Sequence, residues 1–186
     1  MVKKILFVVS ILYFSNVAHA ITLEVGAFYF SDKLSSTNNY TTTDTMYDIA
    51  VLMTSEGKHP FGVGWSFSGV TSKQTTSGET SYTATETGPK FTYLFGKENS
   101  WYLGLIYNLQ AKAQYSDPSG SAQWRGTSIK GEFGYMPNIS TKINFGVKLN
   151  YDSANYTEQV TNSSTLTETS NKKTMIYPTV AMIFKW

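Results

Sequence analysis

From Ile21 to Trp186, apolar and polar residues alternate with a period of two, and this pattern favours antiparallel β-strands over helices. The alternating segments have their cores at residues 21–30, 45–54, 61–71, 82–95, 101–115, 123–136, 141–153 and 173–186. One face of each segment is apolar and uncharged, whereas the other holds small and polar residues, including Gln110 and Lys112 in the fifth segment. Such segments fit either a water-soluble barrel with its apolar face inside or a membrane barrel with its apolar face outside.

Three features of the segments favour the membrane barrel. The polar face is rich in Gly, Ala, Ser and Thr, which the narrow interior of an eight-stranded barrel requires. Aromatic residues gather toward the segment ends on the apolar face, as in the aromatic girdles at membrane interfaces. Long polar connections, such as 31–44 and 154–172, alternate with short turns, such as 56–60 and 137–140. The sequence therefore predicts an all-β fold, an eight-stranded antiparallel up-and-down transmembrane β-barrel.

Two prolines interrupt the apolar faces of this expected barrel. Pro89 and Pro178 lack the N–H group that a sheet ladder uses, so each marks a departure from regular pairing. We expect a β-bulge in the fourth segment, at about residues 86–89. The sheet must otherwise close on itself, because each unpaired backbone N–H or C=O in hydrocarbon costs several kcal/mol.

Residues 1–20 have the three parts of a secretory signal peptide. Lys3 and Lys4 form a positive start, residues 5–14 form an apolar core, and Ala18-His19-Ala20 is a cleavage site. We expect residues 21–186 to form one barrel domain in a bacterial outer membrane, with both termini in the periplasm. The formal net charge of +2 comes from the signal segment, so the charge gives no reason to expect a nucleic-acid partner.

The composition argues against most catalytic and metal-binding chemistry. The chain has no cysteine, which excludes disulfides, thiol nucleophiles and Cys-zinc sites. His59, in the short turn 56–60, is the one histidine after residue 20, and a serine nucleophile needs an adjacent base. We therefore expect no enzyme activity, no catalytic residue, no cofactor and no metal site.

The export signal, the alternating segments and the C-terminal stretch 178–186 carry a family resemblance. The chain resembles the small eight-stranded outer-membrane proteins of Gram-negative bacteria, the OmpX/Ail, OmpA-barrel and OmpW-like group. In that group the last strand ends on an aromatic residue, with apolar residues at every second position before it. Here those positions are Val180, Met182, Phe184 and Trp186, with Trp in place of the more usual Phe. The resemblance implies that these four residues are read by the barrel-assembly machinery during insertion. It indicates fold and location rather than a specific activity.

Six charged residues fall in mid-segment on the polar face: Glu24, Asp48, Lys90, Lys130, Glu132 and Lys148. An isolated charge in a partly desolvated interior is costly. We therefore expect these side chains to form one salt-bridge network that fills the barrel. The alternative is a small gated ion path through the same residues.

Four larger side chains share the interior face near the expected outer ends: Phe28, Phe30, Leu52 and Trp124. They would either plug the mouth or line a pocket for small apolar solutes, as the resemblance to OmpW-like proteins implies. The outer segments 35–43 and 161–169 are rich in Thr and Ser, and binding residues occur disproportionately in loops.

We expect a non-enzymatic monomer with a structural or surface-interaction role, in contact with lipopolysaccharide and with a host or cell-surface ligand. The alternative role is a narrow porin-like channel or a carrier of small apolar solutes.

Overall fold

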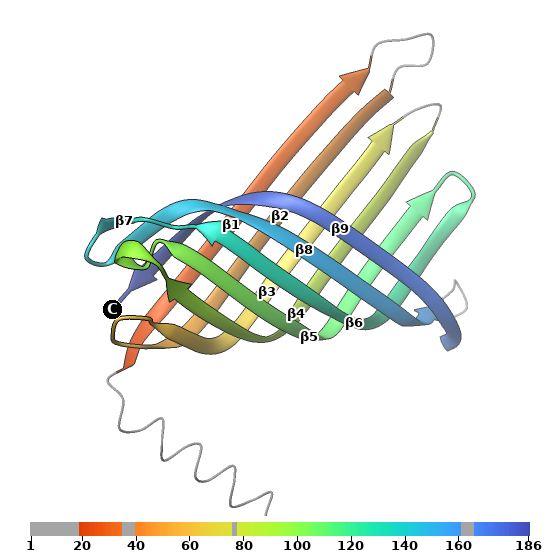
Figure 1. Ribbon diagram of the computed structural model, residues 1–186. Coiled ribbons are helices and arrows are strands. Elements are labelled where there is room, and N and C mark those ends of the chain that lie inside the picture. Colours follow the sequence, from red (N-terminus) through yellow and green to blue (C-terminus); the bar gives the residue numbers. More distant parts are fainter. Residues whose placement is uncertain (1–18, 35–39, 76–77, 161–165) are drawn as a thin grey trace, which may run out of the picture.

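The computed structural model describes residues 19–34, 40–75, 78–160 and 166–186 (Figure 1). The expected signal segment lies outside these ranges except for its last two residues, which belong to the first strand. The strands are β1 (His19–Leu34), β2 (Tyr40–Ser55), β3 (Phe61–Thr75), β4 (Glu79–Phe95), β5 (Trp101–Asp117), β6 (Gly120–Tyr135), β7 (Asn138–Ser140), β8 (Ile143–Val160) and β9 (Leu166–Lys185), with one 3-10 turn, η1 (Lys97–Asn99). None of the described residues belongs to a helix that is long and apolar enough to cross a membrane.

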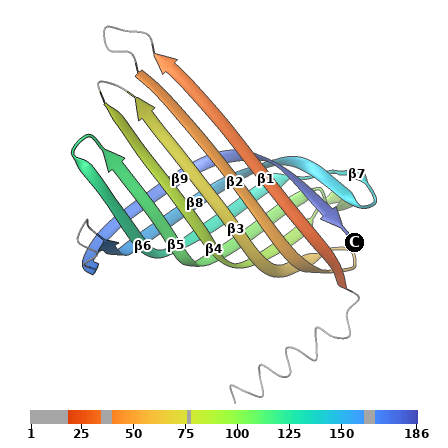
Figure 2. The ribbon, with the colours of Figure 1, turned by 180° about the vertical axis from the view of Figure 1, so that it is seen from behind.

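The strands form one closed antiparallel sheet, which confirms the expected fold class. Each long strand pairs with the next, β6 pairs with β8, and β1 pairs with β9 to close the ring (Figures 1 and 2). The strand count is nine rather than eight, because the three-residue β7 forms a small hairpin with the start of β8. Short connections after β2, β4 and β6 lie at one end, here called the turn end, and the remaining connections lie at the outer end.

The apolar face of the sheet points outward, as the alternation predicts. Trp65 on β3 is 42% exposed, Leu105 on β5 is 57% exposed and Phe145 on β8 is 42% exposed. On the opposite face, Glu24 is 0% exposed and Lys148 is 1% exposed. A water-soluble barrel would show the reverse arrangement, so the sheet is built for an apolar surrounding.

The outward apolar band occupies only part of each strand. It covers residues 101–109 on β5, which matches the roughly 9–11 residues of a tilted transmembrane strand, and the shorter ranges 47–53 on β2 and 145–151 on β8. Aromatic side chains border the band at both ends. At the turn end Trp101 packs between Phe133 and Tyr135, with ring centroids 5.4 and 5.3 Å away.

Above the band, at the outer end, the polarity of the sheet reverses. Outward positions there are occupied by polar residues such as Thr45, Thr83 and Thr85. Inward positions hold a buried apolar cluster, called here the outer cluster: Met46, Val70, Tyr82, Ala84, Ala111, Ala113, Ala154, Tyr156 and Tyr177. The outer half is therefore built like a water-soluble barrel, with its own hydrophobic core.

The long outer loops expected from the sequence are mostly strand. The β1–β2 hairpin continues to Leu34 and Tyr40, and the β8–β9 hairpin continues to Val160 and Leu166. Threonine is abundant in these segments, and β-branched residues fit pleated sheet well. The hairpins β1–β2, β3–β4 and β5–β6 project beyond the rest of the barrel in both views (Figures 1 and 2).

A register shift lies between Thr87 and Lys90 in the β4–β5 ladder, at the height where a bulge was expected in the fourth segment. The extra residue, however, lies on β5, which also shifts against β6 between Asn108 and Ala111. A bulge reverses the faces of the residues that follow it. Consequently Gln110 and Lys112 are exposed, contrary to the expectation that they face the interior, and Ala111 takes the inward position.

The seam that closes the barrel is short. The β1–β9 ladder runs from Thr22 to Ala27 on β1, facing Val180 to Lys185 on β9. The backbone N–H of Trp186 donates to the Ile21 carbonyl oxygen at 2.9 Å and ends the seam. Beyond Ala27, the outer part of β1 is paired with β2 alone among the described strands.

Candidate functional site

The barrel interior is divided into layers along its axis. At the turn end lies a small apolar cluster, called here the inner cluster: Leu94, Tyr102, Met136, Ala181 and Ile183. The six expected charged residues form the next layer, a second polar layer follows, and the outer cluster closes the outer end. Because apolar layers lie on both sides, the charges are held away from bulk water.

The structure brings all six charged residues together from five strands. Lys90 Nζ lies 2.8 Å from Glu24 Oε1 and 2.7 Å from Glu132 Oε2. Lys148 contacts Glu24, and its Nζ lies 3.2 Å from both Asp48 Oδ1 and Glu132 Oε1. Each of these two ammonium groups therefore binds more than one carboxylate, and the residues form a connected network.

Lys130 is held less tightly than the other two lysines. Its Nζ lies 3.7 Å from Glu132 Oε1 and 4.0 Å from Asp48 Oδ2, and it has no hydrogen-bond partner among the described residues. It also lies 5.5 Å from the ring centroid of Tyr177. Lys130 thus contributes charge balance more than direct hydrogen bonding.

Tyr102 joins the network from the inner cluster. Its hydroxyl group lies 2.9 Å from Glu24 Oε2 and 2.8 Å from Glu132 Oε2. The sequence places Tyr102 on the interior face, but its role emerges only when strands β1, β5 and β6 are arranged in space. A phenol is suited to this position because its ring packs with apolar neighbours while its O–H serves a carboxylate.

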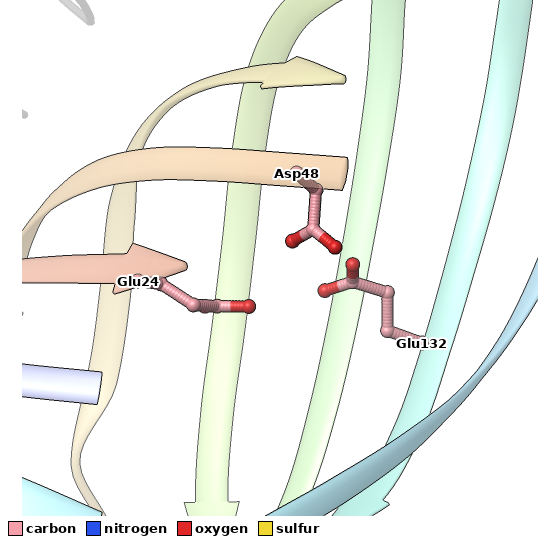
Figure 3. Close-up of side chains that lie close together, drawn as sticks. All are labelled: Glu24, Asp48 and Glu132. Atoms are coloured by element: carbon pink, nitrogen blue, oxygen red, sulfur yellow. The ribbon is translucent and has the colours of Figure 1, made fainter. Parts of the chain in front are cut away.

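The carboxylates of Glu24, Asp48 and Glu132 point toward one another (Figure 3). They have ligand oxygens within 4.8 Å of each other, a spacing at which a metal ion can be bound. Three lysine ammonium groups already lie among these oxygens and match the three negative charges. A cation would have to displace an ammonium, so the arrangement is a neutral ion-pair cluster rather than a metal centre.

The turn end of the interior leaves little room for water. The space enclosed by Leu52, Leu94, Tyr102, Ile183 and their neighbours has a volume of about 10 Å³. A water molecule needs at least about 10–15 Å³ on this measure. The layer of charges is therefore closed from this side by packed side chains.

The four residues expected at the outer mouth do not form one pocket. Phe28 and Trp124 pack against the outer cluster, and Phe30 stacks on Phe28 with ring centroids 6.5 Å apart while remaining 47% exposed. Leu52 lies at the turn end, because β2 runs from the outer end toward its turn and pairs Leu52 with Thr22. The expectation for Leu52 had the correct face but the wrong end.

A cavity of about 220 Å³ does occur at the outer mouth. Its lining residues are Tyr82, Tyr115, Trp124, Tyr156, Asn171, Lys172 and Lys173. Tyr82 and Tyr156 form part of this lining and hydrogen-bond to each other through their hydroxyl groups at 2.7 Å. Lys173 Nζ lies 4.7 Å from the ring centroid of Tyr82. Of this lining, the sequence predicts only Trp124 as a pocket residue. Tyr156 falls in an expected loop, and Tyr82 and Tyr115 lie at the ends of expected strands, where the alternation alone gives them no role.

The remaining candidate positions lie on the surface. Val180 and Trp186 of the C-terminal stretch are exposed, whereas Met182 and Phe184 are half-buried on the same outward face beside β1. His59 is exposed in the β2–β3 turn, with its ring 6.2 Å from that of Tyr93. Residues 35–39 and 161–165 of the Thr/Ser-rich segments lie outside the described residues, while 41–43 and 167–169 belong to β2 and β9.

Comparison with known proteins bears on the fold alone. No protein-family model and no curated protein sequence matches the chain. The fold is similar to the crystal structure of Neisserial surface protein A (NspA), with a TM-score of 0.51, 11% identity, and coverage of 90% of this chain and 97% of that chain. The outer-membrane protease OmpT from Escherichia coli gives a TM-score of 0.39 at 10% identity, covering 91% of this chain and 94% of that chain. The OmpT likeness is too distant to support any statement about this chain.

Proposed function

Because this chain has the fold of the small outer-membrane β-barrels, we propose that it resides in a bacterial outer membrane as a non-enzymatic, non-conducting surface protein. The observation that carries the proposal is the layered interior, in which an ion-pair network lies between two apolar clusters. An ion crossing this interior would have to break buried salt bridges and pass through packed side chains. Both are costly, so conduction is disfavoured.

The outer hairpins are the part of the molecule suited to recognition. They carry outward Thr side chains above the apolar band, and the hairpins β1–β2 and β3–β4 rise furthest (Figure 2). Hydroxyl groups both donate and accept hydrogen bonds and carry no charge. This chemistry suits a polar, uncharged partner such as the glycans of a host cell or of another cell. The rigid sheet below would hold these groups at a fixed height.

Lipopolysaccharide is a second proposed contact of the outward face. Lys112 on β5 and Arg125 on β6 are register partners, and both are exposed just above the apolar residue Leu109. Like charges directly opposite each other in a sheet repel. Glu158, the register partner of Arg125 on β8, offsets part of this repulsion, and an anion beside Lys112 would remove the rest. Phosphate groups of the outer leaflet would supply that anion.

The orientation follows from the same proposal. The outer hairpins face the medium, so the short turns and both ends of the barrel domain face the periplasm. The C-terminal residues Val180, Met182, Phe184 and Trp186 would then be available to the barrel-assembly machinery during insertion.

Planar-bilayer recording tests the non-conducting role. We expect the refolded protein to insert without discrete current steps, and a matched porin inserted by the same procedure shows that insertion is detected. Stable openings that change in amplitude in a K130Q/E132Q variant would replace this proposal with the narrow channel.

Binding to cells tests the surface role. Bacteria displaying the protein should bind target cells better than bacteria displaying a variant with Thr43, Thr45 and Thr71 changed to Ala. A variant with Glu56 and Lys58 changed to Gln, in the opposite turn, serves as the matched control. Equal binding by all three would remove the role proposed for the hairpins.

The mouth cavity supports a second candidate, a binding site for small apolar solutes. Its aromatic walls and its volume of about 220 Å³ suit a single aromatic ring system. Two results would favour this role over simple surface adhesion. An added aromatic solute should quench the fluorescence of Trp124, and calorimetry should show that binding of the same solute is lost in a W124F variant.

A further inference from the structure

The cavity at the outer mouth has a wall of aromatic side chains that come from β4, β5, β6 and β8. The Tyr115 and Trp124 rings are nearly parallel, with an interplanar angle of 9° and centroids 5.7 Å apart. The Trp124 ring is also 5.8 Å from that of Tyr156, whose hydroxyl group is hydrogen-bonded to that of Tyr82. These contacts between the rings themselves hold the wall in one arrangement.

Strand β9 completes the lining with polar and positively charged groups. Asn171 and Lys173 are half-buried, in alternation with exposed residues of the same strand. In the β8–β9 register, Asn171 faces Tyr156 and Lys173 faces Ala154. The Lys173 ammonium nitrogen lies 4.7 Å from the ring centroid of Tyr82. A positive charge therefore lies at the edge of the aromatic wall.

Lys173 has no ion-pair partner among the described residues. All Asp and Glu residues of the chain belong to the described part, because the segments outside it contain neither. None of these carboxylates forms an ion pair with Lys172 or Lys173. This includes Asp152, which lies two positions along β8 from the register partner of Lys173. The positive charge at the cavity is therefore available to an anionic ligand.

The cavity volume of about 220 Å³ suits a single ring with one small substituent. A cavity of about 150 Å³ accommodates benzene, so the remaining space holds a group of the size of a carboxylate. A sugar ring suits this lining less well, because each of its buried hydroxyl groups would need a hydrogen-bond partner. The Tyr82 and Tyr156 hydroxyl groups already bond to each other.

We propose that the mouth cavity binds an aromatic carboxylate, a single aromatic ring that bears one negatively charged carboxylate group. The ring packs against the aromatic wall, where rings stack or meet edge to face. The carboxylate accepts a charge-assisted hydrogen bond from Lys173 Nζ, and the Asn171 amide supplies a second donor. This inference rests on the solute-binding role proposed above for the same cavity, and it adds a negative charge to the solute.

The position of Lys173 gives the cavity its selectivity. An uncharged ring would cover the ammonium group without supplying a partner, and burial of an unpaired charge is costly. A cationic ring would be repelled by the same group. A carboxylate alone among these ligands compensates the charge that it covers.

Calorimetric titration of the purified, folded protein in detergent tests this ligand class. The probes are benzoate, benzamide, which keeps the shape without the charge, and glucuronate, which carries its carboxylate on a hydroxylated ring. We expect benzoate to bind at one site per barrel. Benzamide and glucuronate should each bind at least about tenfold more weakly, the effect of losing one hydrogen bond to a charged group or one aromatic contact.

Replacement of Lys173 isolates the contribution of the charge. K173Q should weaken benzoate binding by about tenfold or more and leave benzamide binding unchanged. K97Q removes an exposed lysine of η1 at the opposite end of the barrel, and this matched control should bind benzoate as the wild type does. The comparison of benzoate with benzamide uses the wild-type protein, so it holds even if K173Q does not fold.

The possible failures are distinguishable. Equal binding of benzoate and benzamide overturns the inference but leaves the cavity as a site for uncharged solutes. Equal binding of benzoate and glucuronate, or an unchanged benzoate affinity in K173Q, overturns it as well, because the ring or the lysine would then have no role. If none of the three probes binds, the solute-binding role fails together with this inference.

Discussion

The free energy of unfolding should depend strongly on Lys148, less on Lys130 and least on the exposed Lys73. In the structure, the Lys148 ammonium group contacts Glu24, Asp48 and Glu132, and its side chain is fully buried. A Lys148→Met substitution keeps the length of the side chain and removes the charge. The network then holds three buried carboxylates against two ammonium groups.

The expected magnitude follows from these contacts. Removing one partner of a buried ion pair costs about 3–5 kcal/mol, because the remaining charge is left uncompensated. Lys130→Met should cost less, about 1–3 kcal/mol, since Lys130 makes only longer ion pairs and no hydrogen bond. Lys73→Met breaks an exposed pair with Glu79 and should cost less than about 1 kcal/mol.

Urea titration of the protein folded in lipid vesicles, followed by tryptophan fluorescence, measures the three differences. Adding Glu24→Gln to Lys148→Met restores the charge balance and should recover part of the loss, with a coupling of about 1–3 kcal/mol. The stabilising role of the network is refuted if the free energies of unfolding of Lys148→Met and the wild type differ by less than about 1 kcal/mol. A difference that small is the contribution of an exposed ion pair, and the network would then not stabilise the barrel.

Three further predictions address orientation, the outer turn and packing. Brominated lipid should quench Trp65, which is on the outward face, and spare Trp124; equal quenching would contradict the assigned faces. Hydrogen bonds from Ser119 to Asp117 in the exposed β5–β6 turn hold the Asp117 pKa below its ordinary value. Protonation therefore removes stability from this turn as the pH falls through that lowered pKa, and amide hydrogen exchange near the turn should rise only there. A Cβ at Gly64 would lie 1.9 Å from a β2 carbonyl oxygen, so G64A should lose about 1–3 kcal/mol in the same urea titration, whereas an unchanged midpoint would refute the close approach.

The period-two pattern predicts which residues face outward because a single sheet with one apolar face has only two possible orientations. The same parity placed the six charged residues on the inner face before their contacts were visible. What parity does not give is height along the barrel. Leu52 was therefore assigned to the wrong end, and the inward tyrosines of the outer half were not recognised as a core.

Local irregularities account for most of the remaining differences. One extra residue on β5 turned Gln110 and Lys112 outward, although both follow the alternation up to that point. The Glu24–Lys148 ion pair comes from strands far apart in sequence, and only the closure of the sheet brings these two residues together. The threonine-rich segments read as loops because they are polar, yet a sheet that rises into water needs polar residues on its outer face.

The short β1–β9 seam defines how deeply the barrel sits. Above Ala27 and Val180 the facing edges of the first and last strands separate, and their peptide groups need water or another partner. Acyl chains supply neither, so the hydrocarbon boundary on this side cannot lie much above that point. The point where the first and last strands separate thus limits the height of the hydrocarbon boundary on this side of the barrel. This limit comes from the backbone and not from any side chain.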